Sequence, residues 1–169
     1  MVKQIILPVL AVLAFVIIVG LFVQKAPALN IPGIDLDQDS STVKDKSITI
    51  GKNVIRVEVA NTADARKKGL SGRSSLDEET GMLFSFDSQN VSPNFWMKDM
   101  QIPLDLIWIN DGKIVKIDQN APAPKAGTPD NKLPIFSPGQ PVDHVLEVYG
   151  GYTLRHDVKV GDSVDLSKI

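Results

Sequence analysis

The sequence contains no cysteine and only two histidines, His144 and His156, among its 169 residues. The lack of cysteine excludes disulfides, thiolate metal sites and cysteine nucleophiles. Two imidazoles also leave little material for a zinc site or a Ser-His-Asp triad. His144 and Glu147 are three residues apart, and on a strand this spacing puts them on opposite faces, so a shared metal ion is not expected. We therefore expect neither a metal ion nor another cofactor.

The chain also lacks an excess of charge of one sign. It carries 18 basic and 20 acidic side chains, for a net charge of −2, and the charges are interspersed along the sequence. Proteins that bind nucleic acid usually present a basic patch, so this balance argues against a nucleic-acid partner. Neither the GxGxxG nor the Walker pattern is present, which argues against a nucleotide-binding loop.

One long apolar run stands near the start of the chain. Residues 5–23 read IILPVLAVLAFVIIVGLFV and contain no charge. As a helix this run spans about 28 Å, which is close to the hydrocarbon thickness of a membrane. We expect residues 1–25 to form a single-pass anchor in the cell membrane, with the rest of the chain on the extracytoplasmic side. Ala26-Pro27-Ala28 also fits a signal-peptide cleavage pattern, so a removed signal segment is the alternative.

Two further regions follow the apolar run. Residues 26–46 combine prolines, aspartates and a Ser-Ser-Thr cluster with no apolar periodicity, which predicts a polar linker. Residues 47–169 are enough for one soluble domain with its own core. Within them, residues 121–141 carry many prolines and glycines and are expected to form a long loop.

Short strands are the main expectation for residues 47–169. Asn110-Asp111-Gly112 between two apolar runs is a strong hairpin signal. Alternation and apolar runs bounded by turn residues predict strands at 47–50, 54–60, 82–86, 104–109, 114–117, 142–149 and at the end of 158–166. We therefore expect a mostly β fold: a compact β-sandwich or barrel-like domain with one or two short helices, preceded by a transmembrane helix.

Capping signals predict those helices. Thr62 is placed to cap a helix over residues 63–68, and Gly69 is placed to end it. Ser75 with Glu78 three residues later fits a capping box and predicts a second short helical turn.

Four segments in a fixed order carry a family resemblance. They read RKKGLSGR at 66–73, GMLFSF at 81–86, FWMK followed by IPLD at 95–105, and VLE with a Gly-Gly pair at 145–151. In this order and spacing they resemble the family called domain of unknown function 192, over nearly all of residues 47–166. Ser71 stands where the family usually has methionine, and Asp99-Met100 where it usually has Asn-Thr. The resemblance implies a compact β-rich domain, often behind a signal or membrane segment, and implies no substrate or reaction.

Two carboxylates fall in otherwise apolar strands. Asp105 shares its face with isoleucines, and Glu147 shares its face with Val145 and Tyr149. Burying an ionised carboxylate without a partner costs several kcal/mol, so each is expected to be paired or to line a pocket. The available cationic partners are Arg66, Arg73 and Lys98.

These residues suggest one candidate site. Arg73, Lys98, Asp105 and Glu147 are interpreted as a polar ligand-binding cleft beside Trp96, whose ring suits stacking on a flat ligand or a sugar. A structural ion-pair network, with Trp96 closing one end of the core, is the alternative interpretation.

Three functions remain open at this point. The first is a non-catalytic binding or accessory domain for an envelope glycan, a small anionic ligand or a partner protein. The second is a hydrolase or lyase that uses Asp105 and Glu147 as acid and base, with Arg73 holding an anionic group. The third is a purely structural module for assembly or stability.

Overall fold

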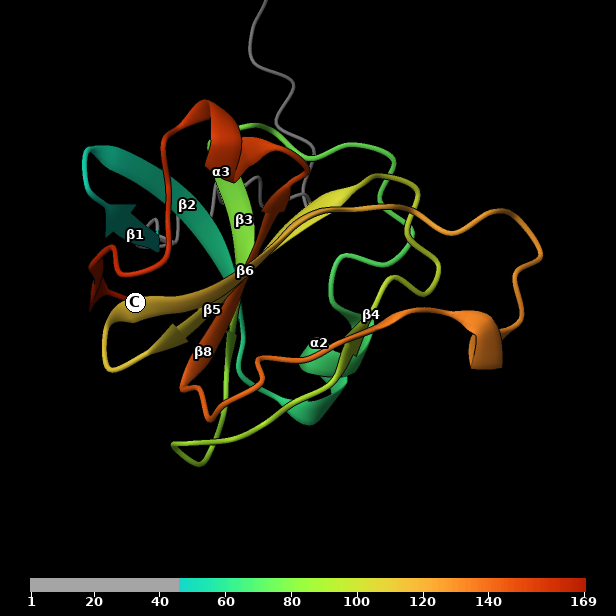
Figure 1. Cartoon of the computed structure of the whole chain (residues 1–169), viewed down its shortest axis with the longest axis horizontal. Helices are drawn as coiled ribbons and strands as arrows, with labels where there is room; N and C mark the ends of the chain where they lie inside the picture. The colour runs from blue at the N-terminus through green and yellow to red at the C-terminus, as the bar shows by residue number, and fades with distance from the viewer. Residues whose placement is uncertain (1–45) are drawn as a thin grey trace, which may run out of the picture. The chain divides into compact units, whose positions relative to one another are not determined.

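A computed structural model describes residues 46–169, which are built around a single curled β-sheet (Figure 1). The elements are β1 (Ser47–Ile50), β2 (Asn53–Ala60), α2 (Ala63–Lys68), β3 (Thr80–Ser85), β4 (Phe95–Trp96), β5 (Leu104–Asn110), β6 (Lys113–Ala121), the 3-10 turn η1 (Asp130–Lys132), β7 (Ile135–Phe136), β8 (His144–Tyr149), α3 (Tyr152–Arg155) and β9 (Val164–Lys168). The expectation of a mostly β, barrel-like domain with short helices is confirmed for these residues.

The sheet has seven strands in the order β6-β5-β8-β3-β2-β1-β9. Neighbouring strands are antiparallel except β2 and β3, which pair in parallel across a connection that contains α2. At one end the two outer strands approach each other: the N–H of Ile114 donates to Asp162 over 3.0 Å, and the N–H of Gly161 donates to Ile114 over 2.8 Å. The sheet is therefore curled into a half-barrel and is not two stacked layers.

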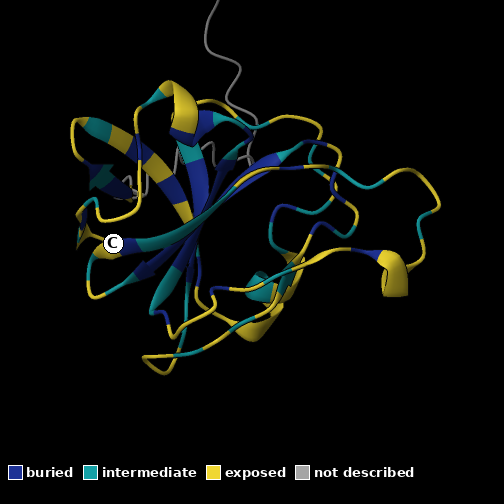
Figure 2. Cartoon of the chain, in the orientation of Figure 1, coloured by how far each residue is buried: buried dark blue, intermediate teal, exposed yellow. Residues whose placement is uncertain are grey.

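Both faces of the central strands are buried (Figure 2). The concave face carries side chains from all seven strands and is closed by Tyr152 of α3. The convex face carries Phe84, Leu106 and Trp108 and is covered by α2, the β4–β7 ribbon and loops. A strand buried on both faces reads as a near-continuous apolar run, which is how β5 appears in the sequence.

The local signals for the first helix and the hairpin are confirmed. The Oγ1 of Thr62 accepts a hydrogen bond from the N–H of Ala65 over 3.1 Å, and α2 ends at Gly69. Asp111 and Gly112 both have positive φ, +47° and +65°, as a type I′ turn between two antiparallel strands requires.

Other local predictions were wrong or incomplete. Ser75 and Glu78 lie in a loop with a β-turn and start no helix. The second helix is α3, four residues that follow Gly151 and have no side-chain cap, so no sequence signal marked them. The loop at 121–141 contains η1 and β7, and β7 pairs with β4 as a two-residue ribbon too short to show any alternation.

The predicted anchor at residues 5–23 and most of the predicted linker lie outside the described residues. Within residues 46–169, no helix is long and apolar enough to cross a membrane.

Candidate functional site

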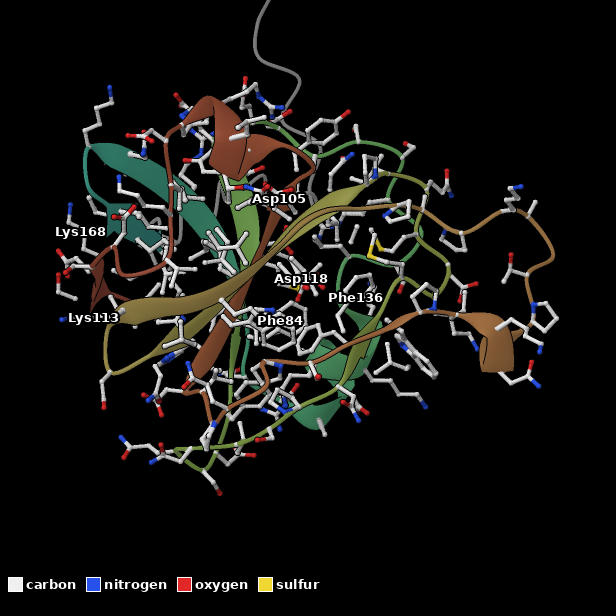
Figure 3. All side chains as sticks on the ribbon, in the orientation of Figure 1. Phe84, Asp105, Lys113, Asp118, Phe136 and Lys168 are labelled. Carbon is white, nitrogen blue, oxygen red and sulfur yellow. The ribbon has the colours of Figure 1, made fainter. Side chains whose placement is uncertain are left out.

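The five candidate residues do not meet at one site. In the register of the sheet, Asp105 of β5 lies opposite Val148 of β8, and Glu147 lies opposite Leu106. Directly opposed residues share a face, and successive residues alternate between faces. Asp105 and Glu147 therefore point to opposite faces of the sheet. In Figure 3, Asp105 lies beside α3, whereas Phe84 lies on the side of α2. Phe84 belongs to the same face of the sheet as Glu147.

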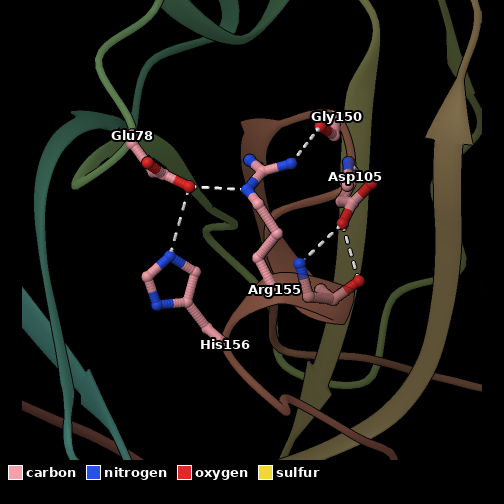
Figure 4. A network of polar contacts seen from close by, with 7 residues as sticks. Glu78, Asp105, Gly150, Arg155 and His156 are labelled. Atoms are coloured by element: carbon pink, nitrogen blue, oxygen red, sulfur yellow. Dashed lines mark hydrogen bonds and ion pairs between the residues drawn. The ribbon is translucent and has the colours of Figure 1, made fainter.

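Asp105 holds α3 onto the end of the half-barrel (Figure 4). Its side chain is fully buried, and Oδ1 accepts from the N–H groups of Asn120 and Gly151 over 2.7 and 2.8 Å. Oδ2 accepts from the N–H and the hydroxyl of Thr153 over 2.8 and 2.6 Å. Asp105 is thus satisfied by backbone amides and a threonine. The expected pairing with an arginine or lysine was wrong for this residue.

Arg73 pairs with a carboxylate that the sequence interpretation did not consider. Its guanidinium donates two hydrogen bonds to Glu58 of β2, over 2.6 and 2.7 Å. The hydrogen bond from Arg73 is the largest cause that lowers the pKa of Glu58. Arg73 is thus paired with Glu58 near the surface and contacts neither Asp105 nor Glu147.

Trp96 and Lys98 do lie together, as expected. The Nζ of Lys98 is 5.7 Å from the centre of the Trp96 ring and forms an ion pair with Asp130 of η1. That hydrogen bond raises the pKa of Lys98. The Trp96 side chain is 49% exposed, so it does not close the core; the fully buried Trp108 fills that place, with its Nε1 donating to Asp118.

Glu147 is the unusual group of the molecule. It is only 5% exposed, and no side chain or amide within residues 46–169 forms a hydrogen bond or ion pair with its carboxyl group. Its neighbours in the sheet register are Met82 and Leu106, both apolar. Burial raises the pKa of Glu147 to about 8, because no compensating charge or donor stabilises the carboxylate.

The Glu147 carboxyl borders a cavity of about 330 Å³, which we call the Glu147 pocket. That volume is at the lower end of the range for small-molecule sites. The wall is largely aromatic and apolar, with one charged edge formed by α2. The lining residues are Arg66, Lys67, Lys68, Gly69, Leu70, Ser71, Phe84, Phe86, Pro93, Asn94, Phe95, Trp96, Met100 and Glu147.

Packed rings fix the aromatic wall. Phe84 of β3 and Phe95 of β4 meet edge to face with centroids 4.8 Å apart, and Phe95 meets Trp108 in the same manner at 5.5 Å. Gly69, at φ +48°, lets the chain leave α2 against this wall: a Cβ there would sit 3.3 Å from the Cζ of Phe84. The pocket is therefore held by packed side chains on both sides.

Arg66 fastens α2 to the sheet. Its guanidinium donates to the carbonyl oxygens of Asn61 and Ser85 over 3.0 and 2.8 Å, and it pairs with Asp87 over 3.1 Å. Lys67 and Lys68 are exposed, and in the described part of the chain neither forms an ion pair. Residues 66–69 carry part of the family resemblance, but nothing in their spacing indicates that they face Glu147.

The arrangement excludes the predicted acid–base pair. Asp105 and Glu147 lie on opposite faces, and Arg73 faces Glu58, so no single substrate can contact all three. What remains is one buried carboxyl group, Glu147, in a pocket that also includes Trp96.

Comparisons with known proteins agree with this fold and supply no reaction. The sequence model of the family DUF192, described as Uncharacterized ACR, matches residues 46–166. A crystal structure from Sinorhizobium meliloti, described provisionally as a transcription regulator, is similar with a TM-score of 0.64 and 29% identity, over 73% of this chain and 95% of that one. A protein of unknown function from Novosphingobium aromaticivorans is similar with a TM-score of 0.62 and 32% identity, over 70% of this chain and 83% of that one. Among curated proteins none matches significantly.

Proposed function

This chain belongs to the DUF192 family, and we propose that it acts as a non-catalytic binding or accessory domain that holds a small polar ligand in the Glu147 pocket. The observation that carries the proposal is the Glu147 carboxyl, buried in an apolar wall without a partner and open to the cavity. Within the described residues the carboxyl oxygens of Glu147 have no hydrogen-bond partner but are not sealed from solvent, so a ligand in the cavity can reach them and hydrogen-bond to them.

The aromatic wall supports a ligand with a flat or apolar face. Trp96 is half exposed at the edge of the cavity, and Phe84, Phe86 and Phe95 continue the surface inward. Concave sites with mostly apolar walls and a few convergent polar groups are the usual form of small-molecule sites. A sugar unit of an envelope glycan or a small anionic molecule fits this description better than a flat protein surface does.

Binding is favoured over catalysis by the composition of the wall. Glu147 is the one acidic side chain among the lining residues that the structure describes, and no imidazole joins it. Hydrolysis by paired carboxylates needs a second acid on the other side of the scissile bond. Asp105 cannot serve, because its oxygens accept four hydrogen bonds on the opposite face.

We also propose that the domain works on the outer face of the membrane, held by residues 5–23. The length and apolarity of that segment support this location. The description of the S. meliloti protein as a regulator is not extended to this chain, because its net charge of −2 and interspersed charges do not suit nucleic-acid binding.

Isothermal titration of the full-length protein with muropeptides and common glycans tests the proposal. Binding should produce heat and shield Trp96 from acrylamide quenching, since Trp108 is already inaccessible. Trp96→Ala and Glu147→Gln should each weaken binding about tenfold or more. Arg73→Ala is the control, because Arg73 pairs with Glu58 outside the pocket. Binding that Arg73→Ala weakens as much as Trp96→Ala does would contradict the assignment of the pocket.

A further inference from the structure

We propose that the ligand of the Glu147 pocket is a small zwitterion, with a primary ammonium group that pairs with the Glu147 carboxylate and an anionic group that meets Lys67 and Lys68. This inference rests on the proposed function and names the chemistry of its ligand. Three features of the pocket support it: the carboxyl group, the aromatic wall and the two lysines on the edge formed by α2.

The carboxyl group selects the ammonium end. Glu147 lies in the sheet beside the apolar Met82 and Leu106, and none of the three cations that line the pocket forms an ion pair with it. A charge-assisted hydrogen bond between an ammonium and a carboxylate is about twice as strong as one between neutral groups. Because most of the wall is apolar, a ligand ammonium therefore gains more from Glu147 than a hydroxyl does.

The aromatic wall suits the same end of the ligand. Faces of aromatic rings attract cations, including the ammonium groups of lysine side chains and of ligands. Two of these rings already hold protein cations at their outer side: the Arg66 guanidinium carbon lies 5.7 Å from the centre of Phe86, and the Lys98 Nζ lies at the same distance from Trp96. Phe84 and Phe95 line the cavity and are free of such contacts within the described residues.

The charges on α2 select the anionic end. Apart from Glu147, the charged groups that line the pocket are Arg66, Lys67 and Lys68. Arg66 is neutralised by Asp87, whereas the two lysines have no ion pair in the described part. A ligand with only a positive charge would be repelled by them, and a carboxylate or phosphate at its outer end would be attracted. The pocket therefore favours a molecule with opposite charges at its two ends.

Binding of this ligand is coupled to proton release. The carboxyl group of the free protein is largely protonated at pH 7, since burial raises the pKa of Glu147 to about 8. An ammonium group stabilises the carboxylate, so close to one proton leaves on binding. Affinity should then rise roughly 50-fold between pH 6 and pH 8. A neutral sugar hydroxyl would bind the protonated form and release none.

The test compares probes that differ in one charge. The full-length protein is titrated by calorimetry with two zwitterions, 6-aminohexanoate and 5-aminopentyl phosphate. The controls are hexanoate, which lacks the ammonium group, and hexylammonium, which lacks the anionic group. Both zwitterions should bind at least tenfold more tightly than the singly charged probes, and titrations of 6-aminohexanoate in two phosphate-free buffers that differ in protonation enthalpy should reveal the released proton. If only one zwitterion does so, the anionic end is assigned to its carboxylate or its phosphate.

Variants assign the two ends to residues. Glu147→Gln should abolish the proton release and the advantage of an ammonium group. The double change Lys67→Gln with Lys68→Gln should abolish the advantage of the anionic group alone, and Lys159→Gln, an exposed lysine near β9, is the matched control. Melting temperatures of all variants show that the fold is retained.

The outcomes separate this inference from the proposed function. Equal binding of hexanoate and 6-aminohexanoate, or binding without proton release, overturns the ammonium assignment and leaves the pocket as a binding site. Equal binding of hexylammonium and 6-aminohexanoate overturns the anionic assignment. If no zwitterion binds while a glycan binds through Trp96, only this inference fails. If neither zwitterions nor glycans bind, the proposed function fails as well.

Discussion

Asp105 and Glu147 show how the surroundings of a single residue decide its role. Both are buried carboxyl groups on neighbouring strands. Asp105 accepts four hydrogen bonds from amides and a hydroxyl, so its charge is compensated and its position is fixed. Glu147 receives none from the described residues, and the neutral form is favoured instead. The first group therefore stabilises the fold, and the second is available to a ligand.

Glu147 should make the stability of the domain depend on pH. A carboxyl group whose pKa is raised by folding, from 4.5 to about 8, binds a proton more readily in the folded than in the unfolded chain. Its contribution to stability is full below pH 4.5, falls as the pH rises to 8 and is constant above that. Glu147→Gln removes this loss, so we expect it to stabilise the protein by a few kcal/mol more at pH 8.5 than at pH 5.

Urea unfolding of both proteins at the two pH values measures this effect. Taking the difference between them cancels the titration of every group that the two chains share. A stability difference that is the same at pH 5 and pH 8.5 would show that Glu147 keeps an ordinary pKa.

At the scale of elements, one buried side chain attaches a whole helix. The four residues of α3 are too few to be stable alone, and Asp105 of β5 holds the start of this helix by accepting hydrogen bonds from the N–H groups of Gly151 and Thr153. Arg155 adds a second attachment at the surface: its Nε donates to Glu78 over 2.6 Å, and His156 lies 3.5 Å from the same oxygen (Figure 4).

Asp105→Asn should therefore destabilise the fold without affecting the Glu147 pocket. The asparagine side chain keeps one acceptor oxygen and replaces the other by an NH₂ group. Either Thr153, or Asn120 together with Gly151, then loses the acceptor of its hydrogen bond. We expect a loss of about 3 kcal/mol in the free energy of unfolding, read from denaturant midpoints.

The matched control is Asp157→Asn, whose side chain is almost fully exposed and should change stability by less than about 0.5 kcal/mol. Ligand affinity should be unchanged in both variants. A loss of affinity in Asp105→Asn at a temperature where it is folded would contradict the separation of the two faces.

Elements with a local cause could be predicted from the sequence, and those that depend on distant partners could not. Thr62 caps α2 three residues away, and the Asp111-Gly112 turn needs only its own dihedral angles. The parallel pairing of β2 with β3 and the β4–β7 ribbon join segments whose contact has no local signature. The same limit applies to the site: Arg73 meets Glu58 because α2 and the loop after it turn the chain back toward β2.

The site could be predicted only in its parts. An apolar strand with one carboxylate marks Asp105 and Glu147 alike, although only Glu147 is left without a partner among the described residues. Trp96 and Lys98, two residues apart in FWMK, lie together. Whether Glu147 and Asp105 shared a face depended on the register between β5 and β8, which composition and alternation do not give when both faces are apolar.

At the scale of the whole molecule, the segments that precede the domain bear on where it works. Residues 5–23 are long and apolar enough in sequence for one membrane crossing, and the polar composition of residues 26–46 predicts a spacer before β1. A site on a domain so tethered would meet ligands of the cell envelope at high local concentration.

We expect the full-length protein to stay with the membrane fraction through alkaline carbonate extraction, and a variant lacking residues 5–23 to be released. Protease should digest the domain when it is added to cells with a permeabilised outer envelope and an intact cytoplasmic membrane. Intact mass of the purified protein decides between anchor and signal segment: loss of the residues up to Ala28 would mean cleavage. Release of the full-length chain by carbonate without cleavage would refute the anchor.

The burial of both sheet faces gives Asp105 and Glu147 one more role. Because both faces of β5 and β8 are apolar, a register shift of one residue would replace one apolar face by another. The burial of apolar area alone would therefore disfavour such a shift only weakly. Such a slip would turn Asp105 away from its amide donors and push Glu147 into the closed interior of the half-barrel, and both changes are heavily penalised. The two carboxyl groups thus help to fix the register between β5 and β8, and Glu147 also lines a pocket.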